Sequence, residues 1–247
     1  MILFFYRLLT ISIDKPFYGI VVARRRDYVG SNLKQVSDQY RKIRNTFRFL
    51  LGVTSDFDGN LVAYENLEPI DKYMLISLND MLVKVKNAYD NYDFVQATNT
   101  MTNFMTNELS SYYCDYAKDI LYCDEGERRR QVQSVLYQAI DVLVKLWSPV
   151  LVFTTEEVYS FFRPNEDSVH YTHFPKEQTY QNSNEVKADF AKLHVLRDAV
   201  LKALEEARQN KTIGKSLEAH VTLNVSDEDK ALLEKNFKDK VNQWLIV

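Results

Sequence analysis

The sequence predicts a mainly α-helical protein, in which an antiparallel helical bundle is followed by a small, truncated α/β piece. Over most of the chain, apolar residues recur at intervals of three and four, which is typical of helices with one buried face. The 247 residues include only six glycines and five prolines, so the chain has few residues that favour tight turns. After Gly214 the apolar spacing changes to two, which is typical of a β-strand.

The first thirty residues are atypical for a bundle of this kind. Met1–Tyr6 is apolar, but Arg7 follows this run instead of preceding it, and Asp14–Pro16 interrupts the next apolar run. Neither a signal peptide nor a membrane span is therefore expected. We predict three regions: an N-terminal segment (1–30), a helical domain (31–212) and the start of a truncated α/β subdomain (213–247).

The first predicted helix has a regular apolar stripe. We expect Ser31 or Asn32 to cap its start and Gly52 to end it in the left-handed conformation. Its stripe recurs at intervals of four and three, and consists of Val36, Tyr40, Ile43, Phe47 and Leu50.

This helix is also the most basic part of the chain. From Arg24 to Arg48 there are eight Lys and Arg residues against two Asp residues, a local charge of +6 in a chain whose net charge is −3. The rest of the chain therefore sums to −9. A basic ridge on an acidic protein favours a polyanion bound at one place, and an ordinary solvated helix face is the alternative.

Five further helices are expected before residue 213. Asp93 is a predicted N-cap, Pro149 separates two helices, and Thr154 with Glu157 has the spacing of a capping box. The expected helices cover about 69–91, 93–123, 127–147, 154–162 and 186–210. Beyond them we predict a strand over 217–225, a helix that starts at Ser226, and a second strand over Trp244–Val247.

The sequence offers little for catalysis or metal binding. Gly214–Ser216 would need a glycine at Gln209 to form a phosphate-binding loop. His170 and His173 are expected to be exposed residues without a third metal ligand. Cys114 and Cys123 are too few for a disulfide framework or a four-thiolate metal site, so buried thiols are expected.

Four segments carry a resemblance to one family. Ser37–Gly52 reads SDQYRKIRNTFRFLLG and resembles the first long helix of the anticodon-binding bundle in bacterial isoleucyl-tRNA synthetases, which are class I aminoacyl-tRNA synthetases. Three later segments are similar to further markers of that family, in the family's order: Glu108–Tyr122, Leu146–Val158 and Ala207–Ala219. The residues IGKSLEA, at the end of the segment Ala207–Ala219, favour the isoleucine enzyme over its valine and leucine relatives.

The resemblance implies that the chain is a fragment of an isoleucine–tRNA ligase that contributes the anticodon-binding domain to protein biosynthesis. Its implied partner is an isoleucine-accepting tRNA and not a membrane, its implied location is the cytoplasm, and its implied state is a monomer. The family's catalytic signatures and editing domain do not occur in this sequence. The resemblance therefore implies no catalytic residue, no metal and no cofactor in this chain, and no activity of the chain alone; ATP and Mg²⁺ would act in the missing catalytic domain.

Two groups of cations are expected to contact tRNA phosphates. They are Lys34, Arg41, Lys42, Arg44 and Arg48 in the first helix, and Arg208, Lys211 and Lys215 near the end of the last bundle helix. Two alternatives stay open: a helical protein-interaction module that uses the same basic ridge, and the equivalent domain of a valyl or leucyl relative.

Overall fold

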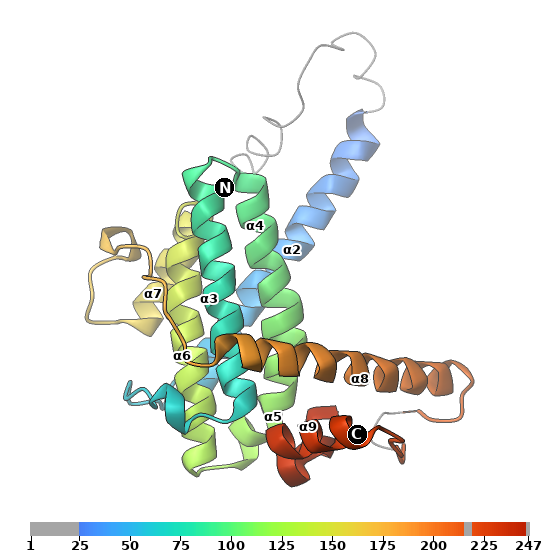
Figure 1. Ribbon diagram of the computed structural model, residues 1–247. Coiled ribbons are helices and arrows are strands. Elements are labelled where there is room, and N and C mark those ends of the chain that lie inside the picture. Colours follow the sequence, from blue (N-terminus) through green and yellow to red (C-terminus); the bar gives the residue numbers. More distant parts are fainter. Residues whose placement is uncertain (1–24, 215–218, 246–247) are drawn as a thin grey trace. The chain divides into compact units, whose positions relative to one another are not determined.

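The computed structural model describes residues 25–214 and 219–245 (Figure 1). Chain contacts divide the described residues into two compact units. The first unit contains the described residues up to Gly59 together with Leu78–Ser111 and Leu136–Gln178. The second unit contains Asn60–Ser77, Tyr112–Val135 and the described residues from Thr179 onward.

The first unit is an antiparallel helical bundle, as predicted. Tyr89, near the end of α3, donates a hydrogen bond to the carbonyl oxygen of Leu146, near the end of α6, at 2.9 Å. The indole of Trp147 lies 3.2 Å from the sulfur of Met105 in the intervening helical run, which passes in the opposite direction. The helices that contribute to this unit are α2 (Arg25–Val53), α3 (Pro69–Asp90), α4 (Phe94–Asn103), the π-helical segment η2 (Phe104–Cys114), α6 (Glu127–Trp147), α7 (Val152–Phe162) and the short η3 (Val169–Tyr171).

The core of the first unit includes the predicted stripe of α2. Ile43, Phe47 and Leu50 are buried, while Val36 and Tyr40 are half-buried. The predicted ends of this helix are wrong, because α2 begins at Arg25 and ends at Val53.

Local hydrogen bonds explain why α2 does not stop at Gly52. Both the amide and the hydroxyl of Thr54 donate to the carbonyl oxygen of Leu50, at 3.1 and 2.8 Å, and the Ser55 hydroxyl donates to the carbonyl oxygen of Gly52 at 2.9 Å. These hydroxyl groups satisfy the carbonyl groups that a left-handed glycine would otherwise help to satisfy. The glycine with positive φ, 82°, is Gly59 in the following turn.

The other bundle helices begin and end close to the predicted residues. Asp93 caps α4, since its carboxylate accepts from the amide of Gln96 at 2.9 Å. The helical run that follows includes η2 and α5 (Asp115–Cys123), so its middle is π-helical. The capping box at Thr154 is wrong: α7 begins two residues earlier, and the Thr154 hydroxyl hydrogen-bonds to Tyr40 instead.

The second unit has an aromatic core. Tyr73 stacks on Phe190 with ring centroids 4.4 Å apart, and Phe237 stacks on Trp244 at 4.5 Å. The indole of Trp244 donates to the hydroxyl of Tyr112 at 3.0 Å. Besides η1 (Tyr64–Asn66), the first turns of α3 and α6, and α5, this unit contains α8 (Ser183–Gln209), α9 (Asp227–Phe237), η5 (Lys238–Lys240) and α10 (Val241–Leu245).

A buried ion pair joins three segments of the second unit. Asp71 at the start of α3 is fully buried and accepts a hydrogen bond from Tyr113 at 2.7 Å. Both terminal nitrogens of Arg128, at the start of α6, donate to the same carboxylate. The Nε of Arg128 lies 3.1 Å from Glu68. Each charge in this network is therefore compensated within hydrogen-bond distance.

The predicted strands near the end of the chain are not found in residues 219–245. Residues 219–225 have no regular secondary structure, and residues 215–218 lie outside the described residues. The predicted start of a helix at Ser226 is confirmed, since Ser226 is the N-cap of α9 and its hydroxyl accepts from the amide of Asp229 at 3.1 Å. The prediction of a strand at Trp244 is wrong, because Val241–Leu245 is helical and buries Trp244 in the aromatic core; the last two residues are not described.

The mainly α fold class is confirmed for the described residues. None of the helices in this part of the chain has the length and apolar character needed to cross a membrane. The domain boundaries at residues 30 and 212 remain predictions.

Ile43→Asp tests whether the stripe of α2 holds the first unit together. An unpaired carboxylate in place of a buried side chain should lower the free energy of unfolding by about 3 kcal/mol or more. Ile43→Val should lower it by only about 1 kcal/mol. Urea unfolding followed by circular dichroism measures both, and equal effects of the two variants would contradict the assignment.

Asp71→Leu tests the buried ion pair. This variant leaves Arg128 buried without its main partner, so the free energy of unfolding should fall by about 3 to 5 kcal/mol. The double variant Asp71→Leu/Arg128→Met removes both charges and should be more stable than Asp71→Leu alone. Arg128→Met alone completes the cycle, and a double variant whose destabilisation equals the sum of the two single-variant effects would show that the two residues do not interact.

Candidate nucleic-acid interface

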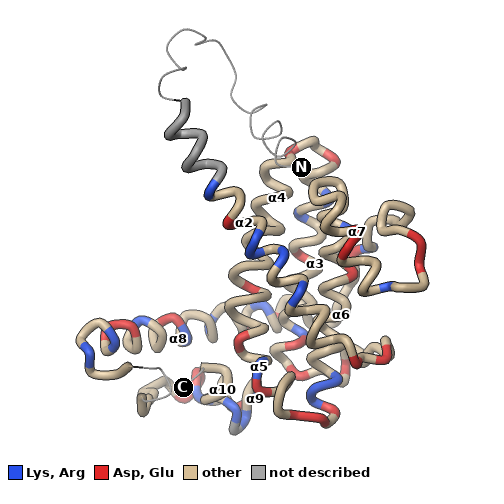
Figure 2. The backbone as a smooth tube through the Cα atoms, turned by 180° about the vertical axis from the view of Figure 1, so that it is seen from behind, with Lys and Arg blue, Asp and Glu red and all other residues tan. Residues whose placement is uncertain are grey.

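The predicted basic ridge lies along the exposed side of α2. Figure 2 shows its cations along this helix, and the side chains of Lys34, Arg41, Lys42, Arg44 and Arg48 are all exposed. Arg41, Arg44 and Arg48 are three and four residues apart, so they lie on one flank. Successive members of this row are separated by about 4.5 and 6 Å along the helix axis.

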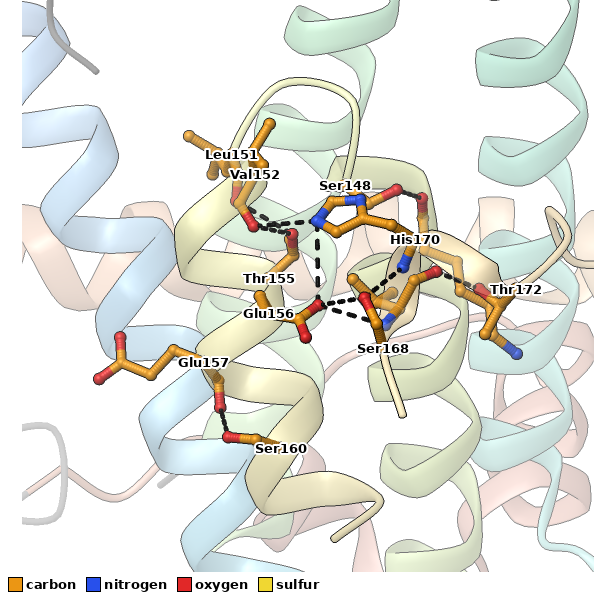
Figure 3. Close-up of polar contacts among 12 residues, drawn as sticks. Ser148, Leu151, Val152, Thr155, Glu156, Glu157, Ser160, Ser168, His170 and Thr172 are labelled. Carbon is orange, nitrogen blue, oxygen red and sulfur yellow. Dashed lines mark hydrogen bonds and ion pairs between the residues drawn. The ribbon is translucent and has the colours of Figure 1, made fainter. Parts of the chain in front are cut away.

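Arg44 has a carboxylate partner inside the first unit. Its two terminal nitrogens donate to the two carboxylate oxygens of Glu157 on α7, at 2.5 and 2.9 Å. Figure 3 shows the Glu157 side chain reaching from α7 toward the neighbouring α2. The hydrogen bond lowers the pKa of the Glu157 carboxyl below its usual value of 4.5 and raises the pKa of Arg44. Much of the charge that was predicted for phosphate binding at Arg44 is therefore compensated.

The other cations of α2 have weaker ion pairs than Arg44 or none with a described residue. Arg41 lies 3.6 Å from Asp38, and 70% of its side chain is exposed. Lys34, Lys42 and Arg48 form no ion pair with another described residue. An exposed ion pair contributes little stability, so Arg41 can exchange Asp38 for another anion at small cost.

A second contact sets the alignment of α2 with α7. The hydroxyl of Tyr40 and the hydroxyl of Thr154 are 3.0 Å apart and share a hydrogen bond. The two contacts, Tyr40 with Thr154 and Arg44 with Glu157, advance together along both helices, so α2 and α7 run in the same direction where they meet.

The segment after α7 is bonded back to that helix (Figure 3). The Glu156 carboxylate accepts from the hydroxyl of Ser168 at 2.9 Å and from the amide of Val169 at 3.3 Å. His170 lies 3.8 Å from the same carboxylate and 3.4 Å from the carbonyl oxygen of Val152. These contacts fix the rotation and position of α7 from its other side.

The histidines and cysteines do not form a reactive cluster. His170 and His173 are exposed, as predicted, and the described residues contain no group of three potential metal ligands among His, Cys, Asp and Glu. Cys114 is buried, and burial raises its thiol pKa to about 12. Cys123 is exposed at the end of α5, so the prediction that it is buried is wrong.

The second predicted group of cations lies in the second unit. Arg208 pairs with Glu205 at 2.5 Å in the last turn of α8. Lys211 is exposed and has a φ of 58°, and Lys215 lies outside the described residues. The described residues of this group therefore provide fewer cations for phosphate binding than α2 does.

The chain resembles known proteins over most of its length. Residues 71–223, more than half of the chain, match the family described as "Anticodon-binding domain of tRNA ligase". The chain belongs to this family. It is also 47% identical over 220 residues to the isoleucine–tRNA ligase of Bacillus subtilis and 45% identical over 220 residues to that of Lactiplantibacillus plantarum. Each alignment covers 87% of this chain, and the chain spans about a quarter of these relatives, since 24% of each is covered.

Sequence reasoning missed two features of this anticodon-binding domain. The spacing of Thr154 and Glu157 predicts a capping box, whereas Glu157 forms an ion pair with Arg44 across 113 residues of chain. The second feature is the exposure of Phe153 and Phe161 on α7. A signal was present, because Phe153, Glu157 and Phe161 are spaced four residues apart and do not coincide with the stripe formed by Val158 and Phe162.

Glu157→Gln tests the contribution of the Arg44 pair through its pH dependence. The lowered pKa of Glu157 means that the pair stabilises the folded state above pH 4.5 and loses this contribution as the pH falls through the folded-state pKa. The stability difference between parent and variant should be below about 1 kcal/mol at pH 7, because the pair is exposed, and should vanish in acid. Glu125→Gln in the loop after α5 is the control, and a difference that grows in acid would contradict the interpretation.

Proposed function

We propose that this chain binds an isoleucine-accepting tRNA and that the row of cations on α2 contacts the tRNA phosphates. The observation that carries the proposal is the exposed set Lys34, Arg41, Lys42 and Arg48 on a domain of the anticodon-binding family. Contacts from Lys and Arg to phosphates position an RNA without reading its sequence. The similarity to isoleucine–tRNA ligases supports the isoleucine-accepting tRNA as the partner.

The bundle core supports this role because it fixes where the cations point. Ile43, Phe47 and Leu50 are buried on one side of α2, so residues on the opposite side must face solvent. Steps of about 6 Å between helical turns allow Arg41 and Arg48 to reach different phosphates of one strand. In this proposal Arg44 holds α7 beside the row, and its charge is shared with Glu157.

The proposal assigns tRNA binding, and not catalysis, to this chain. Because the chain spans about a quarter of its relatives, the reaction of the whole ligase with ATP and Mg²⁺ is assigned to other parts of that protein. This chain would supply tRNA contacts as a monomer in the cytoplasm. The second group, Arg208, Lys211 and Lys215, would add phosphate contacts near the end of α8.

Arg41→Gln/Arg48→Gln tests the proposal by salt titration. Removing one phosphate contact should reduce the slope of log affinity against log salt by about 0.7 to 0.9, so the double variant should show a slope reduced by up to about two units. Its folding stability should stay close to that of the parent, because both side chains are exposed. Fluorescence anisotropy with labelled tRNA at several salt concentrations measures the slope.

The matched control removes the same charge elsewhere. Lys84→Gln/Lys202→Gln changes two exposed lysines on α3 and α8 and should keep the parent's slope. An unchanged slope for the α2 variant would place the RNA contact elsewhere. No tRNA binding by the parent at low salt would favour the protein-interaction module, and equal affinity for valine- or leucine-accepting tRNA would contradict the isoleucine assignment.

A further inference from the structure

Two phenylalanine rings on α7 are exposed without a structural reason in the described unit. Phe153 is 74% exposed and Phe161 is 71% exposed, whereas Tyr159 and Phe162 of the same helix are buried. Phenylalanine has no polar atom that gains from contact with water, so two exposed rings on one short helix are unusual. The buried face of α7 already supplies its packing against the bundle.

The exposed rings share one face with Glu157. Phe153, Glu157 and Phe161 are spaced four residues apart, which places them in one row with about 6 Å between successive members. Glu157 is bonded to Arg44, so this face of α7 is the one beside the cations of α2.

The shared direction of the two helices aligns the rings with the cations. Arg48 lies one turn beyond Arg44 on α2, and Phe161 lies one turn beyond Glu157 on α7. In the other direction, Arg41 precedes Arg44 by about one turn, as Phe153 precedes Glu157. Two rows therefore run side by side, with a cation and a ring at each end and the ion pair between them.

This alternation fits a nucleic-acid strand better than a protein partner. Protein–protein interfaces have an apolar centre that is depleted of charged residues, whereas the charged pair of Arg44 and Glu157 separates the two rings. Proteins that bind single-stranded RNA combine a cationic track for the backbone with aromatic rings on which bases stack. Bases inside a duplex already stack on their neighbours, so exposed rings select bases that are unpaired.

We propose that Phe153 and Phe161 form a stacking surface for unpaired nucleobases of an RNA loop whose phosphates lie along Arg41 and Arg48. The inference rests on the proposed function and extends it, because it names the surface that receives bases in addition to the cations that receive phosphates. Phenylalanine has no hydrogen-bonding group, so this surface holds a loop open without discriminating among bases.

The experiment compares two RNA probes with the whole 247-residue chain. One probe is a hairpin with the anticodon stem and loop of an isoleucine-accepting tRNA, and the other is a blunt duplex of the same stem. Phe153→Leu and Phe161→Leu keep an apolar side chain but remove the flat ring. Tyr122→Leu is the matched control, because this ring is 69% exposed on α5 and is not on α7.

Each α7 variant should weaken hairpin binding by about tenfold and leave duplex binding and the salt slope unchanged, because all of the phosphate-binding cations are kept. A 2-aminopurine base in the loop should be quenched by the parent and less by the variants. Parent-like hairpin binding by both variants would overturn the stacking surface while leaving the proposed function intact. An equal weakening for both probes, or a lowered melting temperature, would make the rings structural and also overturn it. A parent that binds neither probe would overturn the proposed function itself.

Discussion

Burial of Ile43, Phe47 and Leu50 determines how α2 is rotated about its axis, and the surface of the first unit depends on that rotation. Burial of an apolar stripe turns the remaining side chains of a helix toward solvent. With this stripe buried, Arg44 reaches Glu157, and Arg41 and Arg48 lie on the exposed side. Hydrophobic burial in this unit therefore also arranges charge. The ion pair and the hydrogen bond between Tyr40 and Thr154 add alignment along the axis, which burial of a stripe alone does not specify.

Much of the bundle could be predicted from the sequence because its signals are local. The bounds of α3 and α6 and the cap at Asp93 follow from residues within a few positions of each other. The ends of α2 could not be predicted in the same way, because Thr54 supplies hydrogen bonds that made Gly52 unnecessary as a terminator. Thr154 likewise has the local spacing of a helix cap, but its hydroxyl hydrogen-bonds to Tyr40, 114 residues away in the chain.

The candidate site shows where sequence reasoning reached its limit. The exposed positions of Arg41 and Arg48 follow from helical periodicity, but the partner of Arg44 depends on which helix packs beside α2. Near the end of the chain, apolar and polar residues alternate over 217–225, which predicts a strand, but a strand also needs a neighbouring strand to pair with. Trp244 instead lies in a short helix, where its ring stacks on Phe237 and its indole donates a hydrogen bond to the hydroxyl of Tyr112.

The two cysteines differ in a way that gives the chain a built-in labelling position. Burial holds the Cys114 thiol protonated at neutral pH, since its pKa is raised to about 12, and a protonated buried thiol is a poor nucleophile. Cys123 is exposed in the last turn of α5. A maleimide fluorophore added to the native chain would therefore attach at Cys123 alone. One environment-sensitive probe can therefore be placed on the second unit without removing or introducing any residue.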